Sequence, residues 1–187
     1  MRLGITILRA VVGGVFMFHG TQKLFGWFGG HGPEATGQFF EQVGIKPGKR
    51  AALAAGAAEA GGGALVATGL MVPLGSAAIV GVMQQAVRSV HLQKGFENTK
   101  GGYEYNLVLA AAALALADSG PGPLSLDRVL GIRMSGSAWA LAALAAGCAG
   151  PLLLERAAPE EQPPDPAEPP RFVRDAEPAQ ARTATAS

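Results

Sequence analysis

Several ionisable side chains lie within stretches of this chain that are otherwise almost entirely apolar. The segment FMFHGTQKLFGWFGG, residues 16–30, places His19 and Lys23 about one helical turn apart among Phe, Leu and Trp. A carboxylate, Glu59, stands among alanines and glycines in a second such stretch. Because a charged group in apolar surroundings is costly, it normally faces the interior of a helix bundle and has a partner there. Such groups could donate hydrogen bonds to a bound molecule or relay protons to it.

Two further apolar stretches add polar residues. Gln84, Arg88 and His91 follow the spacing that aligns side chains on one helical face, and the next stretch opens with Glu-Tyr-Asn. The acids Glu59 and Glu104 are the partners expected for the bases, and the sequence leaves open which acid meets which base. The predicted polar intramembrane cluster comprises Arg9, His19, Lys23, Glu59, Gln84, Arg88, His91, Glu104, Tyr105 and Asn106.

Composition argues against several other kinds of site. The histidines His19, His31 and His91 lie in separate segments, and none is four residues from another, so no metal site is predicted. Cys148 is the single cysteine, which excludes an intrachain disulfide and a CxxC pair. The net charge is only +1, and no basic stripe with interleaved aromatic residues occurs, so nucleic-acid binding is not expected.

The stretches that carry these residues have the length of membrane-spanning helices. Hydrophobic residues make up 49% of the chain and charged residues 16%, against about 25% charged in a typical soluble domain. A helix needs about 20 apolar residues to cross a bilayer. Four segments approach this length: 3–25, 51–71, 74–92 and 103–117. A fifth apolar segment, 138–154, has no charge. We therefore predict an all-α, polytopic membrane four-helix bundle, with a fifth C-terminal transmembrane helix as an open alternative.

Short connections predict an up-and-down arrangement of these helices. Pro73 and Gly75 indicate a tight turn, so the second and third segments should be antiparallel neighbours. We call the end of the bundle where the chain begins end A, and the opposite end is end B. Most of the polar residues then gather toward end B, with Glu59 about 13 Å inside. This arrangement predicts a polar pocket, although Lys23 and His91 could instead reach the membrane surface.

The remaining parts of the chain are connections and a tail. Residues 29–50 are expected to form a long loop, and the Gly/Pro-punctuated connection 118–137 to hold a short interfacial helix at 125–130. Residues 157–187 are rich in Pro, Ala and acid and are predicted to be disordered. Arg9 interrupts the first segment and no A-x-A site follows, so this segment is expected to be a retained helix and not a signal peptide. Membrane orientation stays open, because two readings of the basic residues disagree.

The predicted helices are also dense in small residues, as in AALAAGAAEAGGGALVATG (51–69). Lipid tails are as apolar as Leu, so membrane helices associate chiefly by close backbone approach across Gly and Ala. We interpret these glycines as helix–helix contacts. No GxGxxG-like pattern follows a predicted strand, so a dinucleotide-binding loop is not expected.

Five ordered pieces of sequence form a specific combination. They are RAVVGGVFMFHGTQKLFG (9–26), EAGGGALVATGL (59–70), MQQAVRSVHLQKGF (83–96), GGYEYNLVLAAAALAL (101–116) and GPGPLSLDRVLG (120–131). Together they resemble the DoxX family of small bacterial integral membrane proteins. The resemblance implies a four-helix membrane domain over residues 1–131. The additional apolar helix at 132–156 and the tail at 157–187 lie outside the four-helix core of the family and are predicted from their composition alone. It also implies a multi-pass protein of the bacterial cell (inner or plasma) membrane.

The functions that this resemblance implies are loose. Some DoxX members are linked with thiol and oxidative-stress defence, as membrane partners of a superoxide dismutase and a sulfurtransferase. A related branch includes a subunit of a thiosulfate:quinone oxidoreductase. The family's polar positions recur here without assigned roles, at Arg9, His19, Lys23, Glu59, His91, Glu104, Ser125 and Asp127.

Three functions stay open at this point. The first is an integral membrane component of a redox or thiol/oxidative-stress system that holds a quinone or another small molecule. His19, Lys23, His91 or Tyr105 would then donate hydrogen bonds, with Glu59 or Glu104 relaying protons. No haem, flavin or cluster motif is present, so electrons would come from a partner or a small reductant. The second is a non-enzymatic scaffold in the lipid bilayer that recruits a soluble oxidoreductase or sulfurtransferase. The third is a small transporter, which would need to form an oligomer because four helices are few.

Overall fold

The computed structural model describes residues 3–157, and within them helices are the only regular structure. Sequence positions 157–187 were expected to form a disordered tail, and all but the first of these lie outside the described residues. The elements are α1 (Leu3–Phe25), η1 (Trp27–Gly29), α2 (Gly32–Gln42), α3 (Gly48–Thr68), α4 (Val72–Ala86), η2 (Val87–His91), η3 (Leu92–Lys94), η4 (Asn98–Lys100), α5 (Glu104–Ser119), α6 (Leu126–Leu130) and α7 (Ser137–Ala157).

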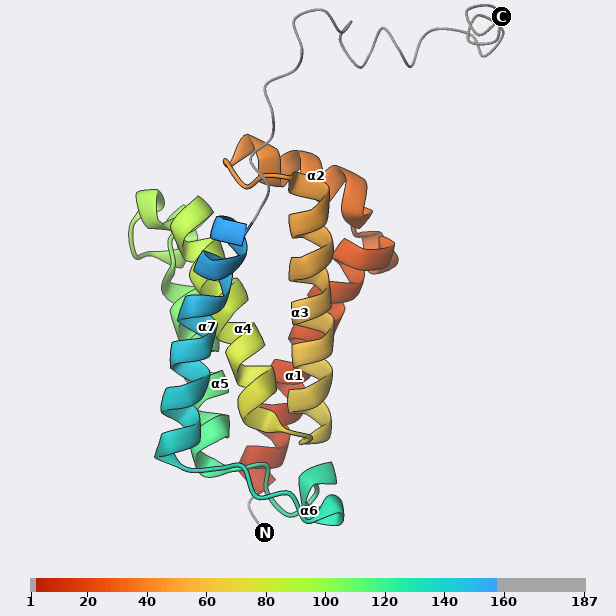
Figure 1. The fold of residues 1–187 in the computed structure, drawn as a ribbon, viewed down its shortest axis with the longest axis vertical. Helices are drawn as coiled ribbons and strands as arrows, with labels where there is room; N and C mark the ends of the chain where they lie inside the picture. Colours follow the sequence, from red (N-terminus) through yellow and green to blue (C-terminus); the bar gives the residue numbers. More distant parts are fainter. Residues whose placement is uncertain (1–2, 158–187) are drawn as a thin grey trace, which may run out of the picture.

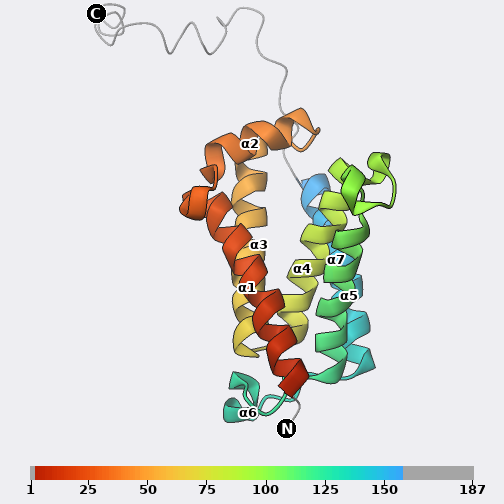
Figure 2. The ribbon, with the colours of Figure 1, turned by 180° about the vertical axis from the view of Figure 1, so that it is seen from behind.

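Five of these helices, α1, α3, α4, α5 and α7, run side by side along the long axis of the molecule (Figure 1). The helix α2 lies across end B, and the short helix α6 lies at end A beside the start of α1 (Figures 1 and 2). Three helices in the described part, α1, α3 and α7, are long and apolar enough to cross a membrane. The all-α membrane bundle is therefore confirmed, and the fifth apolar segment is one of its long helices.

The outer surface of the bundle is apolar, as a lipid environment requires. Long hydrophobic side chains stay exposed along α1, α5 and α7, among them Ile7, Val11, Leu107, Val108, Leu141 and Leu153. In water such a surface would be a large hydrophobic patch. In a bilayer it faces acyl chains, and the helices are left to associate through their packing with one another.

Two connections differ from the sequence-based prediction. Pro73 and Gly75, which were expected to form the turn, belong to the start of α4. The chain reverses direction earlier, at Gly69–Met71. Gly69 takes a left-handed conformation (φ 67°) that ends α3, and Pro73 is accommodated in the first turn of α4, where a backbone N–H is not needed. Residues 29–50 were expected to form a loop, but they contain α2, which begins with Pro33 in its first turn.

The helices α1 and α3 approach each other backbone to backbone. A Cβ added at Gly13 would lie 2.5 Å from the Ala67 nitrogen and the Gly63 oxygen of α3. One added at Gly63 would lie 2.6 Å from the Gly13 oxygen, so the contact is reciprocal. Toward end B, Gly20 meets Ala60 in the same way. The Gly and Ala content of these helices is therefore explained by their packing.

The helices α4, α5 and α7 form the second half of the bundle. Ser76 of α4 donates a 2.7 Å hydrogen bond to the Ala113 carbonyl of α5 and is fully buried. A Cβ at Gly147 of α7 would lie 2.7 Å from the Val80 side chain of α4. The hydrophobic core between the halves includes Phe16, Val66, Ile79 and Leu116. Because α7 packs closely on α4, the predicted separate segment 132–156 is part of the bundle, while the domain boundaries themselves stay a prediction.

The α1–α3 contact predicts opposite effects for two neighbouring substitutions. Gly13→Ala places a methyl group against α3 backbone and should lower the free energy of unfolding by about 1–3 kcal/mol. Gly14→Ala is the matched control, because a Cβ at Gly14 meets nothing within 4 Å. It should leave stability unchanged or raise it by up to about 1 kcal/mol, since Ala favours a helix. Unfolding in mixed micelles with increasing SDS measures both. Equal effects of the two substitutions would contradict the packing described.

Candidate functional site

A buried ion pair joins α1 to α3 near end B. The Lys23 amine lies 2.6 Å from the Glu59 carboxylate, whose side chain is only 4% exposed. Lys23 follows Gly20 by three positions, and Glu59 follows Gly56 by three positions. A Cβ added at Gly56 would lie 3.2 Å from the Lys23 Cβ. The pairing that the sequence left open is thus decided by close backbone approach. Lys23 stays partly exposed and turns toward the rim of the bundle.

His19 lies one turn before Lys23 and belongs to the same group. Its Nδ1 is 3.1 Å from the Gln22 Oε1, and its ring packs edge-on against Phe18. It is near enough to Glu59 for an electrostatic interaction. Its side chain is exposed, in contrast to that of Glu59. The end of α1 therefore presents a histidine, an amide and an ammonium group around one buried carboxylate.

A cavity of about 270 Å³ opens beside this group, between α1, the following turn and α2. Its polar lining comes from Gln22 and Lys23 of α1, from His31 and from Thr36 of α2. Phe39 and Phe40 of α2 supply its aromatic wall, and the remaining lining residues are Gly29, Gly30 and Ala35. We call this cavity the interfacial pocket, because it lies where α1 and α3, both long enough to span, reach end B. Its mixed lining suits an amphipathic molecule with a flat polar ring.

The turn before α2 sets the shape of this pocket. Gly26 and Phe28 both adopt left-handed conformations, with φ of 70° and 54°. Gly30 packs so closely on Gln22 that an added Cβ would lie 2.5 Å from the Gln22 Cβ. The turn folds the chain back over the last turn of α1, with Phe28 stacked on Phe18 at 5.1 Å between ring centroids.

The helix α2 is fixed to the start of α3 by polar contacts. The Gly48 N–H donates a 3.1 Å hydrogen bond to the Glu41 carboxylate. Lys49 forms an exposed ion pair with Glu34, and its hydrogen bond to that carboxylate lowers the pKa of Glu34 below its ordinary value. A Cβ at Gly37 would lie 2.7 Å from the Lys49 nitrogen, so the two backbones touch. The wall that α2 provides is therefore held in place.

The other residues predicted for end B form a second group on α4, α5 and α7. His91 Nδ1 contacts the Gly101 carbonyl at 2.7 Å, which ties the α4–α5 connection to the end of η2. Glu104 accepts a hydrogen bond from the Asn98 N–H at 3.0 Å, again within this connection. Arg88 pairs with Glu155 of α7 at 3.5 Å, where both side chains are exposed.

The three remaining residues lie near this group. Asn106 is buried and contacts the Met83 sulfur at 3.5 Å, whereas Tyr105 is 49% exposed. The Gln84 amide oxygen is buried and has no hydrogen-bond partner among the described residues. These contacts join helices and connections to one another, whereas Lys23 and Glu59 pair with each other.

Arg9 requires a correction, because it lies at end A and not in the predicted cluster. Its guanidinium donates to the Ala67 carbonyl at 3.1 Å and also to the carbonyls of Pro121 and Leu124. Arg9 and Lys23 share a helical face, but their separation of 14 residues corresponds to about 21 Å along the axis. Arg9 and Lys23 therefore lie at different sites, because they are far apart along the helix axis although they share one face of α1. Arg9 is 4% exposed and joins α1 to the connection between α5 and α6.

Sequence reasoning missed several residues that shape the two ends. The aromatic wall, Phe39 and Phe40, was assigned to a loop, although Pro33 followed by Glu34 is a usual helix start. Asp127 and Ser125 entered only through the resemblance, yet both are buried at end A. Among residues 3–157, no three His, Cys, Asp or Glu side chains come together as metal ligands.

Comparison with known proteins agrees with this geometry. The family model described as DoxX matches residues 4–92, which run from α1 to the first residue of η3. This match assigns a DoxX domain to residues 4–92 of the chain. The match includes Lys23, Glu59 and the interfacial pocket, and it ends before α5, α6 and α7. No curated protein and no solved structure matches the chain. The DoxX match and the long apolar helices together indicate a membrane protein.

The Lys23–Glu59 pair predicts a strong energetic coupling. Lys23→Met leaves the Glu59 carboxylate buried without its partner and should lower the free energy of unfolding by about 3–5 kcal/mol. The double variant Lys23→Met/Glu59→Gln removes both charges and should recover much of this loss. SDS unfolding of the single and double variants at neutral pH measures the coupling.

The exposed pair Glu97–Lys100 is the matched control for this cycle, because its side chains are 58% and 70% exposed. Glu97→Gln should change stability by no more than about 1 kcal/mol. Strictly additive effects of the Lys23 and Glu59 substitutions would contradict a buried, coupled pair.

Proposed function

We propose that this DoxX protein is an integral membrane component of a redox or thiol/oxidative-stress system and binds a quinone in the interfacial pocket. The observation that carries the proposal is the pocket itself. It combines two phenylalanines with an imidazole, an amide and an ammonium group at the level where two long apolar helices end. A bacterial cell (inner or plasma) membrane would supply such a quinone.

The size and lining of the pocket fit a quinone headgroup. Its volume of about 270 Å³ lies near the lower limit of about 300 Å³ for ligand pockets. A ring fits within it, while an isoprenoid tail would stay among the acyl chains. Phe39 and Phe40 would pack on the ring, because aromatic faces favour offset stacking. His31, Gln22 and Lys23 would donate hydrogen bonds to its two carbonyl oxygens.

The buried ion pair would serve proton transfer in this proposal. Quinone reduction consumes two electrons and two protons, and the quinone supplies the electron-accepting chemistry when bound. Lys23 lines the pocket and contacts Glu59, so a proton delivered to a quinone oxygen could be replaced from this pair. His19 lies one helical turn before Lys23, is exposed, and would connect the pair to water.

The electrons must come from outside the chain. Cys148 is its single cysteine, so an internal dithiol cannot donate them. A reduced sulfur compound or a soluble partner such as an oxidoreductase or sulfurtransferase would be the donor. The scaffold alternative uses the same surface, because α2 lies outside the bundle at end B and exposes Phe39 (Figure 2).

Photolabelling with an azidoquinone tests the quinone site in detergent-solubilised, full-length protein. Labelled peptides should come from residues 19–42, and excess short-chain ubiquinone should compete. Thr36→Trp fills the pocket and should reduce labelling at least tenfold. His31→Phe removes one hydrogen-bond donor and should weaken binding about three- to tenfold.

Gln38→Trp is the matched control, because it adds the same side chain to α2 at an exposed position that does not line the pocket. It should leave labelling unchanged. Equal labelling of Thr36→Trp and wild type would overturn the site. A soluble oxidoreductase that copurifies while no quinone binds would favour the scaffold function instead.

A further inference from the structure

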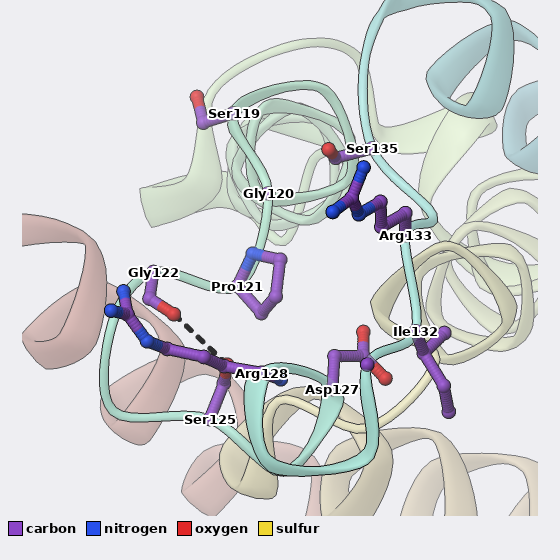
Figure 3. A pocket seen from close by; sticks show the side chains of 11 residues that line it. Ser119, Gly120, Pro121, Gly122, Ser125, Asp127, Arg128, Ile132, Arg133 and Ser135 are labelled. Atoms are coloured by element: carbon purple, nitrogen blue, oxygen red, sulfur yellow. Dashed lines mark hydrogen bonds between the residues drawn. The ribbon is translucent and has the colours of Figure 1, made fainter.

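End A holds a second cavity, which the proposed quinone site does not use. It has a volume of about 400 Å³ and is enclosed by the connection from α5 to α7. Figure 3 shows this connection as a ring around the cavity, with Pro121 on one side and Asp127 and Ile132 on the other. Arg128 and Arg133 also line it, together with Ser119, Gly120, Gly122, Ser125, Gly131 and Ser135. We call it the end-A pocket.

The wall of this pocket is held by Arg9 and Asp127. Arg9 donates to the carbonyls of Pro121 and Leu124, which fixes the first half of the connection to α1. The Asp127 Oδ1 accepts a 2.8 Å hydrogen bond from the Met71 N–H, and the Asp127 N–H donates to the Gly69 carbonyl at 3.0 Å. The short helix α6 is therefore attached to the α3–α4 turn, and the pocket is a built feature of the fold.

One buried acceptor in this wall has no donor. Asp127 is 1% exposed, and its Oδ2 has no hydrogen-bond partner among the described residues. In Figure 3 the carboxyl group extends from α6 toward the space between Pro121 and Ile132. Arg9 acts on Asp127 electrostatically, but its hydrogen bonds go to carbonyl oxygens. An unpaired buried carboxylate oxygen is costly, so a cationic donor from the pocket would stabilise it.

Two arginines add positive charge around the pocket, Arg133 across the cavity from Asp127 and Arg128 next to Asp127 on α6. Arg133 extends toward Ser135, and Arg128 extends past Gly122, as Figure 3 shows. Both arginines are exposed, and no ion pair is formed by either within residues 3–157. Guanidinium groups bind phosphate by paired hydrogen bonds. The pocket thus presents a carboxylate for an ammonium group and guanidinium groups for a phosphate.

The surroundings place this pocket at the membrane surface. The helices α1 and α7 begin beside it and α3 ends beside it, and these are the three helices long enough to span. Hydrophobic side chains on and next to α6 are exposed, with Val129 at 79%, Leu130 at 61% and Leu124 at 59%. Such side chains next to arginines are typical of an interfacial helix whose apolar face meets acyl chains.

From these observations we infer that the end-A pocket binds the headgroup of a zwitterionic lipid with a primary ammonium group, namely phosphatidylethanolamine. The ammonium group donates to Asp127, the phosphate contacts Arg133, and the acyl chains lie along Leu124, Val129 and Leu130. Phosphatidylcholine has the same charge but no N–H donor, and phosphatidylglycerol has the phosphate without the ammonium group. Comparing the affinities of the three lipids therefore separates the contribution of the Asp127 carboxylate from that of the arginine side chains.

Native mass spectrometry of delipidated, full-length protein tests this inference with the three lipids at identical acyl chains. Wild type should bind phosphatidylethanolamine about tenfold more tightly than phosphatidylcholine. Asp127→Asn keeps an oxygen for the Met71 N–H but removes the charge, so this ratio should fall to near one. Arg133→Gln should weaken the binding of phosphatidylethanolamine and phosphatidylglycerol severalfold.

Asp118→Asn and Arg50→Gln are the matched controls. Asp118 lies at the same end but does not line the pocket, and Arg50 lies at end B. Neither should change the ratio. The comparison of lipids on wild type needs no variant, so the inference stays testable if Asp127→Asn fails to fold.

Three results would overturn the inference. They are equal affinities of wild type for phosphatidylethanolamine and phosphatidylcholine, a preference for phosphatidylglycerol, and full competition by free phosphoethanolamine, which would assign the pocket to a soluble ligand.

Discussion

The close approach of α1 and α3 is the contact on which the rest of the structure depends. Gly13 and Gly20 bring the α1 backbone against α3 at two levels, and a side chain at either position would push the helices apart. Lys23 and Arg9, at opposite ends of α1, reach the Glu59 carboxylate and the Ala67 carbonyl of α3 across this contact. The positions of the buried charges are thus set by glycine packing, because lipid offers no hydrophobic force to hold these helices together.

The two ends of the bundle use their charges differently. At end B a Lys–Glu pair lies beside a pocket with an aromatic wall, and α2 covers it from outside. At end A an arginine donates to backbone carbonyls and fixes a connection that would otherwise carry unsatisfied oxygens near the membrane. End B therefore presents hydrogen-bond donors beside a cavity. End A presents a connection held by Arg9, with one carboxylate oxygen of Asp127 unpaired among the described residues.

The bundle extends beyond the residues that match the DoxX family model. The match ends at residue 92, yet Ser76 of α4 bonds to Ala113 of α5, and Val80 of α4 packs on Gly147 of α7. Arg88 of η2 and Glu155 of α7 form a further contact near end B. The helices α5 and α7 therefore pack directly on α4, which lies within the matched residues.

The five long helices of the bundle could be predicted from the sequence, because each contains a run of apolar residues. In α1, α3 and α7 this run is long enough to cross a bilayer. The short helix at 125–130 could also be predicted, and there Ser125 caps α6 by accepting from the Arg128 N–H. That Glu59 would lie inside the bundle with a basic partner also follows from the sequence, since a lone charge in lipid needs a partner.

Only the tertiary structure decided which groups meet. Hydropathy indicates how deep a residue lies in the membrane. Its partner depends on how each helix is rotated and how closely neighbouring helices approach. In this protein, glycine contacts between α1 and α3 set the rotation and the spacing of these helices. Arg9 therefore bonds to carbonyls at end A, although it shares a helical face with Lys23. The wall of the interfacial pocket, Phe39 and Phe40, depends on α2 folding back through left-handed residues at Gly26 and Phe28, a path that no local periodicity encodes.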